Sequence, residues 1–411
     1  MSVKKELGKE GEKMRCFFMR NILDYNVKGK KILVRVDLNS PVVDGKVIMN
    51  ERIAMHAQTL KQLSDKGAKV VALAHQGRDG DPDFLMLQQH AELLSQVIGK
   101  EITFVPYVIG YNVKKTVESM RDGDIVLLEN VRFLKSENLE SGEIVGLSYL
   151  ADYYVLDALS VAHRAHSSVV GFSKIIPAFY GPILYREVEA IKKVKDAEET
   201  VFVLGGAKVD DSFDMIEHRA KSGKKGTYLI GGVIAILLLK AKGYNIGASE
   251  KYLEKEDLLQ YLDRAKKIAS LEGVVLPVDV GLNIDGKRVD ASIDKIEKGE
   301  IFDIGPKTIE NYYKILLNAK NIVMNGPMGV YEVKEFNHGT KKILEAISKS
   351  KGFSLLGGGH TTTALKELGF KNEDFGYVSL SGKALIKFLC GERLPGLEAL
   401  EENEKNFPVP D

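Results

Sequence analysis

The sequence contains no tryptophan, only two cysteines and no long hydrophobic run. Cys16 and Cys390 lie at opposite ends of the chain, which argues against a disulfide framework and against a cysteine-based metal cluster. The most apolar stretch, residues 227–239, contains Gly231 and Gly232 and is shorter than the roughly 20 residues of a membrane-spanning helix. The N-terminus also lacks the apolar segment of a signal peptide. We therefore expect a cytoplasmic protein that does not contact a membrane.

An excess of one charge is also lacking, since 58 Lys and Arg residues nearly balance 57 Asp and Glu residues. A net charge of +1 gives no sign of nucleic-acid binding by the protein as a whole, so any basic site must be local. Proline is scarce, with 11 residues, and 44% of the chain is hydrophobic, which excludes a disordered or fibrous protein. The composition is that of a globular protein with a substantial core.

A chain of 411 residues is longer than one hydrophobic core usually organises. Short β-branched runs recur about every 25 to 40 residues with helical patterns between them, as in parallel βα units. This pattern predicts an α/β protein with two doubly wound parallel-sheet (Rossmann-like) domains joined by a hinge helix. The expected parts are a polar N-terminal extension (1–15), a first domain (16–184), a mostly solvated hinge helix (185–199), a second domain (200–390) and a C-terminal segment (391–411).

Ligands of open parallel sheets bind beyond the carboxyl ends of the strands, and in the first half these ends carry cations and polar groups. The residues are Asp37, Asn39, Arg52, His75, Arg78, Arg132, His163, Arg164 and His166. One Arg or His at a strand end is usually a surface or ion-pair residue, but five strand ends that each supply a cation predict an anion site. A metal site at His163 and His166 is the alternative, and the absence of a nearby cysteine or carboxylate triad argues against it.

The strands of the second half end in glycine, at Gly205-Gly206, Gly231-Gly232, Asn325-Gly326 and Gly357-Gly358-Gly359. Glycine lets the first N–H groups of a following helix approach a phosphate closely, aided by the helix dipole. Any one of these could be an ordinary tight turn, but four of them together with Lys208 predict a nucleotide site. The chain has neither the G-x-x-x-x-G-K-[ST] pattern nor a first-strand G-x-G-x-x-G, so P-loop and simple dinucleotide-binding proteins are disfavoured.

Eight motifs occur in the order found in phosphoglycerate kinases, and the chain resembles that family from about residue 20 to residue 400. In the first half they are Arg35-Val36-Asp37-Leu38-Asn39-Ser40-Pro41, Ala74-His75-Gln76-Gly77-Arg78, Leu128-Glu129-Asn130-Val131-Arg132-Phe133 and Ala162-His163-Arg164-Ala165-His166-Ser167-Ser168. In the second half they are Gly205-Gly206-Ala207-Lys208-Val209, Asp303-Ile304-Gly305-Pro306, Asn325-Gly326-Pro327-Met328-Gly329-Val330-Tyr331-Glu332 and Leu394-Pro395-Gly396.

The resemblance implies that the first domain binds 3-phosphoglycerate or 1,3-bisphosphoglycerate. Asp37 and Asn39 would hold the glycerate hydroxyl and carboxylate, and the non-reacting phosphate would meet His75, Arg78, Arg132 and Arg164. His163 and His166 would form a secondary basic patch. Arg52 and Lys208 would contact the phosphoryl group during transfer, which needs positioning and charge neutralisation but no general base.

The resemblance also implies that the second domain binds ADP or ATP with Mg²⁺ and that bending at the hinge helix closes one domain onto the other. Gly206, Gly231 and Gly232 would contact the adenine. The remainder of the nucleotide would meet Lys208, Asn325, Pro327, Gly329, Val330, Glu332 on the ribose, and Gly358, Gly359, His360 and Thr361 near the phosphates.

Two positions depart from the family pattern. His360 stands where most members have an aspartate that binds magnesium, which leaves the nucleotide, water and Asp211 as the possible holders of the ion. Ser212 stands where a second lysine is usual. These departures indicate a divergent, archaeal-type branch with the same reaction.

Two other functions remain open at this point: another acyl-phosphate or small-acid kinase of the same plan, and a non-catalytic nucleotide-binding protein. The intact motifs around His75 and Arg164 argue against the first, and the presence of Arg52 and Lys208 argues against the second. We expect a monomer by default.

Overall fold

The computed structural model describes residues 19–408 and divides them into two compact units. The first unit contains residues 19–158, 164–185 and 395–408, and the second contains Leu159–His163 and Arg186–Leu394. The predicted N-terminal extension, Cys16 and the last three residues lie outside the described range. No helix among the described residues is long and apolar enough to cross a bilayer.

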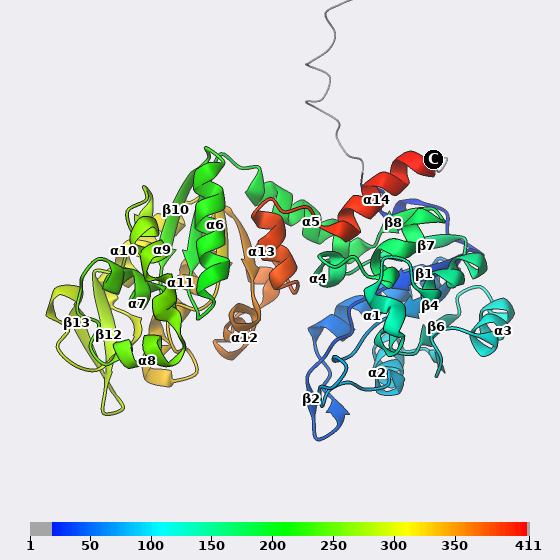
Figure 1. Cartoon of the computed structure of the whole chain (residues 1–411), viewed down its shortest axis with the longest axis horizontal. Helices are drawn as coiled ribbons and strands as arrows, with labels where there is room; N and C mark the ends of the chain where they lie inside the picture. Colours follow the sequence, from blue (N-terminus) through cyan, green and yellow to red (C-terminus); the bar gives the residue numbers. More distant parts are fainter. Residues whose placement is uncertain (1–18, 409–411) are drawn as a thin grey trace, which may run out of the picture. The chain divides into compact units, whose positions relative to one another are not determined.

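The first unit is built on a six-stranded parallel sheet (Figure 1). Its order is β5 (Thr103–Val105), β6 (Ile125–Leu128), β4 (Lys69–Leu73), β1 (Lys31–Arg35), β7 (Tyr153–Leu156) and β8 (Ala178–Tyr180). The helices of this unit are α1 (Glu51–Asp65), α2 (Gln88–Ile98), α3 (Tyr111–Ser119) and α14 (Pro395–Asn406), and a short hairpin joins β2 (Val42–Val43) and β3 (Lys46–Val47). Because β1 pairs with both β4 and β7, the loops after these strands emerge at one edge of the sheet.

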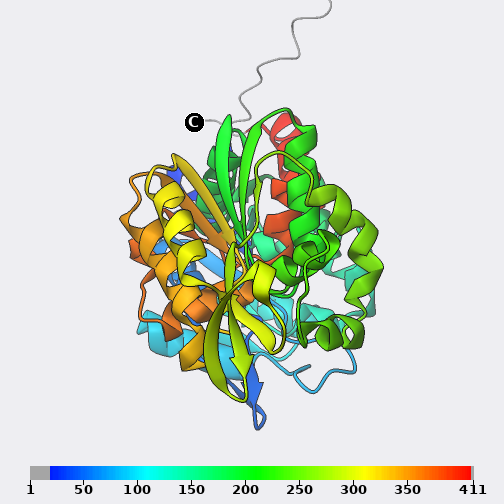
Figure 2. The same cartoon turned by 90° about the vertical axis from the view of Figure 1, so that its left-hand side faces the viewer.

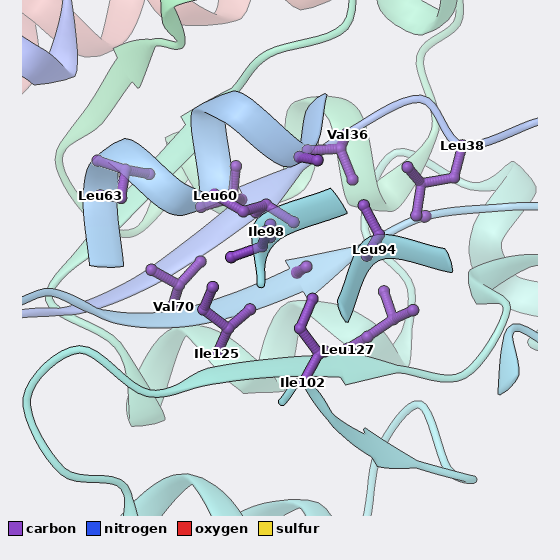
Figure 3. Close-up of a cluster of buried hydrophobic side chains, with 14 of the residues drawn as sticks. Val36, Leu38, Leu60, Leu63, Val70, Leu94, Ile98, Ile102, Ile125 and Leu127 are labelled. Atoms are coloured by element: carbon purple, nitrogen blue, oxygen red, sulfur yellow. The ribbon is translucent and has the colours of Figure 1, made fainter. Parts of the chain in front are cut away.

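One hydrophobic cluster of the first unit lies between this sheet and helices α1 and α2 (Figure 3). Helix α1 buries Ile53, Ala57, Leu60 and Leu63, whose spacing of three and four residues places them on one helical face. The helix begins at Glu51 because the side chain of Asn50 accepts hydrogen bonds from the first backbone N–H groups. This cap sets the position of Arg52 in the first turn.

Helix α14 brings the C-terminal segment onto the first unit. The buried amide of Asn403 accepts a hydrogen bond from the N–H of Ala178 at 2.7 Å and donates to the carbonyl of Ile176 at 2.8 Å. Arg20 donates to the carbonyls of Glu404 and Phe407, at 2.6 and 2.8 Å. The last helix is therefore tied to the edge of the sheet at β8.

The second unit contains another six-stranded parallel sheet, with helices on both of its faces (Figure 2). Its order is β11 (Val274–Val275), β10 (Lys225–Ile230), β9 (Glu199–Leu204), β15 (Asn321–Asn325), β16 (Phe353–Gly357) and β17 (Tyr377–Val378). In chain order this is 3-2-1-4-5-6, the order of dinucleotide-binding folds, which bind ligands where the order reverses. That point lies at the carboxyl ends of β9 and β15.

The helices of the second unit are α4 (Leu159–Ala162), α6 (Val209–Lys221), α7 (Gly232–Ala241), α8 (Ser249–Lys255), α9 (Leu262–Ile268), α10 (Pro306–Leu317), α11 (His338–Lys349), α12 (Gly359–Glu367) and α13 (Lys383–Leu389). Helix α4 packs against α13, so residues 159–163 belong to the second unit. The sequence alone predicts that they belong to the first domain. The prediction of an α/β protein with two Rossmann-like parallel sheets is confirmed.

A three-stranded antiparallel sheet in the second unit was not predicted. It consists of β13 (Lys287–Ser292), β12 (Asp279–Ile284) and β14 (Glu300–Ile304), whereas the sequence pattern predicts parallel sheets alone. The hairpin between β12 and β13 turns at Asp285 and Gly286, which both have positive φ, +52° and +80°. Two such residues in succession form the tight turn that suits the twist of antiparallel strands.

Helix α5 (Pro182–Lys195) carries the boundary between the two units, between Tyr185 and Arg186. It begins and ends earlier than the predicted range 185–199, because Pro182 favours the first helical position and Arg219 binds carbonyls at the end. The Arg219 guanidinium donates to the carbonyls of Lys195 at 3.3 Å and of Ala197 at 2.7 Å. Within the second unit, the buried Glu187 of α5 accepts hydrogen bonds from the hydroxyls of Ser379 and Ser381.

Candidate active site

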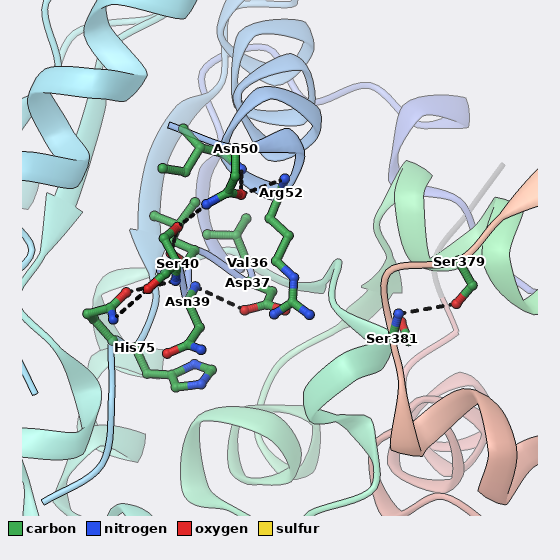
Figure 4. Close-up of polar contacts among 12 residues, drawn as sticks. Val36, Asp37, Asn39, Ser40, Asn50, Arg52, His75, Ser379 and Ser381 are labelled. Atoms are coloured by element: carbon green, nitrogen blue, oxygen red, sulfur yellow. Dashed lines mark hydrogen bonds and ion pairs between the residues drawn. The ribbon is translucent and has the colours of Figure 1, made fainter. Parts of the chain in front are cut away.

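Four of the predicted polar residues lie near the carboxyl ends of β1 and β4: Asp37, Asn39, Arg52 and His75 (Figure 4). Nη1 of Arg52 lies 2.8 Å from Oδ2 of Asp37, and Oδ1 of Asp37 accepts a hydrogen bond from the N–H of Asn39 at 3.1 Å. The amide oxygen of Asn39 accepts a hydrogen bond from the N–H of Gly77 at 2.8 Å. These contacts hold together the loops that follow two neighbouring strands, so a small ligand would meet fixed groups.

The buried His75 is held by Arg35, whose Nη2 lies 3.1 Å from its Nδ1. Burial and the charge of Arg35 lower the pKa of His75 well below its usual value, and Arg132 and Arg164 lower it further. The imidazole is therefore neutral at neutral pH. Since a guanidinium can only donate, Nδ1 is the acceptor and Nε2 carries the proton.

Positive charge is concentrated near His75, because Arg35, Arg132 and Arg164 of the first unit all act on this side chain. Burial and the charges of Arg164, Arg35 and Arg78 lower the pKa of Arg132 to about 10. Burial lowers the pKa of Arg164 as well, followed by the charges of Arg78 and Arg35. The Arg132 guanidinium also donates to the carbonyl of Gly77. Cations that repel one another in this way favour an anion among them.

The structure does not bring His163 and His166 together as a patch of one unit. His163 belongs to the second unit, whereas His166 belongs to the first, where its Nδ1 lies 3.8 Å from Oε1 of the buried Glu137. Among the described residues, no group of three His, Cys, Asp or Glu side chains is placed to hold a metal ion.

A cavity of about 240 Å³ opens in the second unit beside α7 and the antiparallel sheet, and we call it the main cavity. Its walls are mostly apolar, as is usual for a site that takes a flat organic ring. The predicted residues along it are Gly206, Gly232, Pro327, Gly329, Val330, Glu332 and His360. The structure adds Tyr252, Pro277, Val280 and residues 301–304, which sequence reasoning did not assign to the site.

A smaller hollow, here the Lys208 hollow, adjoins the main cavity and shares Gly206, Ala207 and His360 with it. The other predicted residues that line it are Lys208, Asp211, Asn325, Gly358, Gly359 and Thr361. The N–H of Gly326 donates to the Thr361 hydroxyl at 2.8 Å, which links the loop after β15 to the first turn of α12. The hollow thus lies at the carboxyl ends of the central strands, where phosphates bind in such sheets.

Two glycine turns pack directly on each other at this edge. Gly232 has φ +56°, and a Cβ there would lie 2.4 Å from the backbone nitrogen of Gly206. Only glycine fits such a contact without moving the backbone. Gly231, predicted to contact the adenine, lines neither space. A Cβ on it would lie 2.7 Å from Sδ of Met328, so Gly231 packs against a residue that lines the main cavity.

Asp211 is the one carboxylate among the residues that line the Lys208 hollow. Partial burial raises its pKa, and the charges of Lys208 and Lys383 oppose that rise. Lys383 is the first residue of α13, directly after Gly382, which lines the Lys208 hollow. Sequence reasoning missed Lys383, because only the fold brings the start of α13 close to the start of α6.

Comparison with known proteins places these features in context. The phosphoglycerate kinase family model matches residues 22–392. A curated phosphoglycerate kinase from Thermoplasma volcanium is 41% identical over 96% of this chain and 100% of its own length. One from Methanosarcina mazei is 41% identical over 94% of this chain and 97% of its own length.

Solved structures agree with the sequence comparisons. The crystal structure of phosphoglycerate kinase from Pyrococcus horikoshii OT3 has a TM-score of 0.86 and 34% identity, and covers 95% of this chain and 100% of the other. The structure of phosphoglycerate kinase from Coxiella burnetii has a TM-score of 0.81 and 32% identity over 93% of this chain and 99% of the other.

The matched relatives and the paired Rossmann-like sheets define a kinase, an enzyme that transfers a phosphoryl group to or from a nucleotide. The chain belongs to the phosphoglycerate kinase family, as its motifs indicated. Its reaction is the reversible glycolytic transfer between 1,3-bisphosphoglycerate and ADP, which yields 3-phosphoglycerate and ATP.

Proposed function

We propose that ADP or ATP binds in the second unit, with the adenine in the main cavity and the phosphates in the Lys208 hollow. The continuity of the two spaces through Gly206, Ala207 and His360 is the observation that supports this placement most directly. Glu332 at the wall of the main cavity offers a carboxylate to the ribose hydroxyls. The backbone at Gly358 and Gly359, which begins α12, offers N–H groups to the phosphates.

The first unit is proposed to bind 3-phosphoglycerate at the edge that carries Asp37 and Asn39. Asp37 would accept a hydrogen bond from the glycerate hydroxyl, and the amide of Asn39 would donate to the carboxylate. The non-reacting phosphate would meet His75, Arg78, Arg132 and Arg164. Arg132 and Arg164 favour a dianion because each is destabilised by burial and by the other cations of the site.

Phosphoryl transfer places negative charge on the oxygens in flight, so its catalysts are fixed cations. We propose Arg52 and Lys208 for this role, one in each unit. Arg52 is oriented by its ion pair with Asp37, and Lys208 ends the Gly205-Gly206-Ala207 turn at the start of α6. The two ligands must meet for transfer, and α5, which carries the boundary between the units, is the proposed hinge.

Magnesium fits this site only with a small number of protein ligands. Asp211 supplies the one carboxylate of the Lys208 hollow, and His360 is a poor ligand for a hard cation. Mg²⁺ usually keeps several waters and binds through one or two carboxylates plus substrate phosphates, which matches this donor set. When bound with the nucleotide it would neutralise phosphate charge, and a nearby cation would favour the ionised form of Asp211.

We also propose that the protein is a monomer and acts in the cytoplasm on small molecules. The residue roles predict a separation of binding effects. Arg164→Met should weaken 3-phosphoglycerate binding at least about tenfold, the cost of one charge-assisted contact, and leave ATP binding unchanged. Lys208→Met should do the reverse.

Isothermal titration of each variant with each ligand tests this, with Lys135→Met as a control because Lys135 is exposed and outside the proposed site. The assignment of the ligands to the units is wrong if Arg164→Met impairs only ATP, or if Lys208→Met impairs only 3-phosphoglycerate.

A further inference from the structure

A second basic cavity lies in the second unit, at the C-terminal end of α5. It has a volume of about 160 Å³, and we call it the α5–α6 cavity. Its lining comes from α5, β9, α6 and α13, and includes Lys195, His218, Arg219, Phe202, Met215 and Leu389. It shares no lining residue with the main cavity or the Lys208 hollow. The space therefore lies outside the proposed nucleotide site.

Positive charge dominates this lining. Lys195, Arg219 and Lys224 carry this charge and the His218 ring lies among them, whereas Asp196 is the sole carboxylate among the residues that line the cavity. Burial lowers the pKa of Lys195, and the charges of Lys192 and Lys224 oppose Asp196 in lowering it further. Burial also lowers the pKa of His218, followed by the charges of Lys195 and Arg219. The protein has placed cations together here without an equal number of acids.

Two of these cations are already used by the backbone. Arg219 donates to the carbonyls of Lys195, Ala197 and Lys225, and Lys224 donates to those of Lys195 and Asp196. They bind the carbonyl groups at the end of α5 and add positive charge to the cavity. Because several of their donors are already occupied, a ligand would first engage other groups.

The other two polar groups have unused donors. The Lys195 ammonium lies 4.7 Å from the ring centroid of Phe388, and the His218 ring packs on Gly391, where a Cβ would lie 2.6 Å from Cε1. Neither side chain makes a hydrogen bond or an ion pair within residues 19–408. The apolar residues of the same lining are Val194, Phe202, Met215 and Leu389.

We propose that the α5–α6 cavity binds a small organic anion, a phosphate monoester or a carboxylate with a short aliphatic body. The anionic head would accept hydrogen bonds from Lys195 and His218, and the body would lie on Phe202, Met215 and Leu389. The cavity, at about 160 Å³, is smaller than the main cavity, at about 240 Å³, and suits a ligand whose body has a few carbons. Such a ligand bridges the last turn of α5 to α6.

Methionine provides a local reporter for this site. The protein labelled with ¹³C-methyl methionine is titrated with butyl phosphate, butyrate and butylamine, with ATP present to fill the main cavity. The Met215 methyl signal is assigned with a Met215→Leu variant, and Met328, which lines the main cavity, is the internal reference. We expect a saturable Met215 shift with one or both anions, no shift with butylamine, and an unmoved Met328 signal. The two anions separate a phosphate head from a carboxylate head.

Matched variants test whether charge drives the binding. Lys195→Gln and, separately, His218→Gln should each raise the dissociation constant about tenfold, the loss of one charge-assisted hydrogen bond. Lys251→Gln removes an exposed lysine of the same unit and should leave the constant unchanged. An unshifted Met328 signal shows that each variant is folded. The proposal is overturned if Met215 does not respond to either anion, if butylamine shifts it equally, or if both cavity variants bind as wild type does.

Discussion

Nη2 of Arg35 lies 3.1 Å from Nδ1 of His75, and both side chains are buried at the edge of the first unit where we propose that the substrate binds. Because the guanidinium donates, His75 keeps Nδ1 unprotonated and presents Nε2–H as a neutral donor. Nitrogen-15 chemical shifts of His75 should show a neutral ring with the proton on Nε2 at pH 7. A ring protonated on Nδ1 would contradict this geometry.

Loss of Arg35 should therefore change substrate binding without touching the nucleotide site. Arg35→Met is expected to weaken 3-phosphoglycerate binding about tenfold, because the His75 ring can then adopt the other tautomer and a cation is lost. ATP affinity should be unchanged, which also controls for folding. Equal 3-phosphoglycerate affinity in wild type and variant would show that Arg35 does not position His75.

His90 predicts part of the pH dependence of stability. It is fully buried on α2, with Nε2 3.2 Å from Oε1 of Gln76, and burial lowers its pKa to about 4. The unfolded chain, with an ordinary histidine pKa near 6.5, binds more protons between these values, so the free energy of unfolding falls as pH drops through that window. Between pH 7 and pH 5 this histidine accounts for a loss of about 2 kcal/mol.

Urea unfolding at the two pH values measures this loss. In His90→Gln the decrease from pH 7 to pH 5 should be smaller than in wild type by that amount, since glutamine does not titrate. An identical decrease in both proteins would mean that His90 does not carry this linkage.

Gly232 and Gly243 offer a matched test of the glycine turns, because both have positive φ, +56° and +88°. A Cβ at Gly243 meets nothing within 4 Å, whereas one at Gly232 would lie 2.4 Å from the nitrogen of Gly206. Gly243→Ala should therefore cost only the backbone strain, about 1 kcal/mol of stability, with full ATP affinity. Gly232→Ala should displace the Gly206 turn and weaken ATP binding more than about tenfold. If calorimetry gives equal ATP affinities for Gly232→Ala and Gly243→Ala, the close packing of Gly232 on Gly206 is not required for ATP binding.

Lys383 is expected to contribute to phosphate binding, in place of the lysine that Ser212 replaces. Its side chain is exposed, so Lys383→Met should weaken ATP binding by a modest factor, about three- to fivefold. Adenosine, which lacks phosphates, should bind both proteins equally. The control Lys387→Met removes a charge one turn later, where Lys387 pairs with Glu392 at 2.6 Å. If adenosine binding falls as much as ATP binding, the effect of Lys383 is structural.

Much of the fold follows from the sequence because its signals are local. The β-branched runs 69–74 and 153–156 predict β4 and β7 closely. The parallel orientation of the strands follows from the helical segments between them, because a helix returns the chain to the same end of the sheet. The antiparallel hairpin was overlooked even though Asp285-Gly286 is a strong turn signal, because β13 is largely exposed and lacks an apolar run. The end of α5 was misplaced because Arg219, far along the chain, binds its last carbonyls.

The residues of the candidate site likewise fall into those that the sequence predicts and those that only the fold reveals. Residues within motifs, such as Gly206 and Asn325, are predicted by their place after a strand, and the structure puts them on the cavity walls. Tyr252 and Lys383 lie in ordinary helical sequence and reach the site only through packing, so no local pattern marks them.

Two cation-bearing units of this chain transfer a phosphoryl group to a small acid, and we propose Arg52 as a catalytic cation. The most direct measurement is turnover with ATP, Mg²⁺ and 3-phosphoglycerate, in which hydroxylamine traps the acyl phosphate, for wild type and for Arg52→Ala. We predict steady formation of the hydroxamate by wild type and a loss on the order of 10³-fold in the variant. No hydroxamate from a protein that binds ATP, or full turnover without Arg52, would contradict the account.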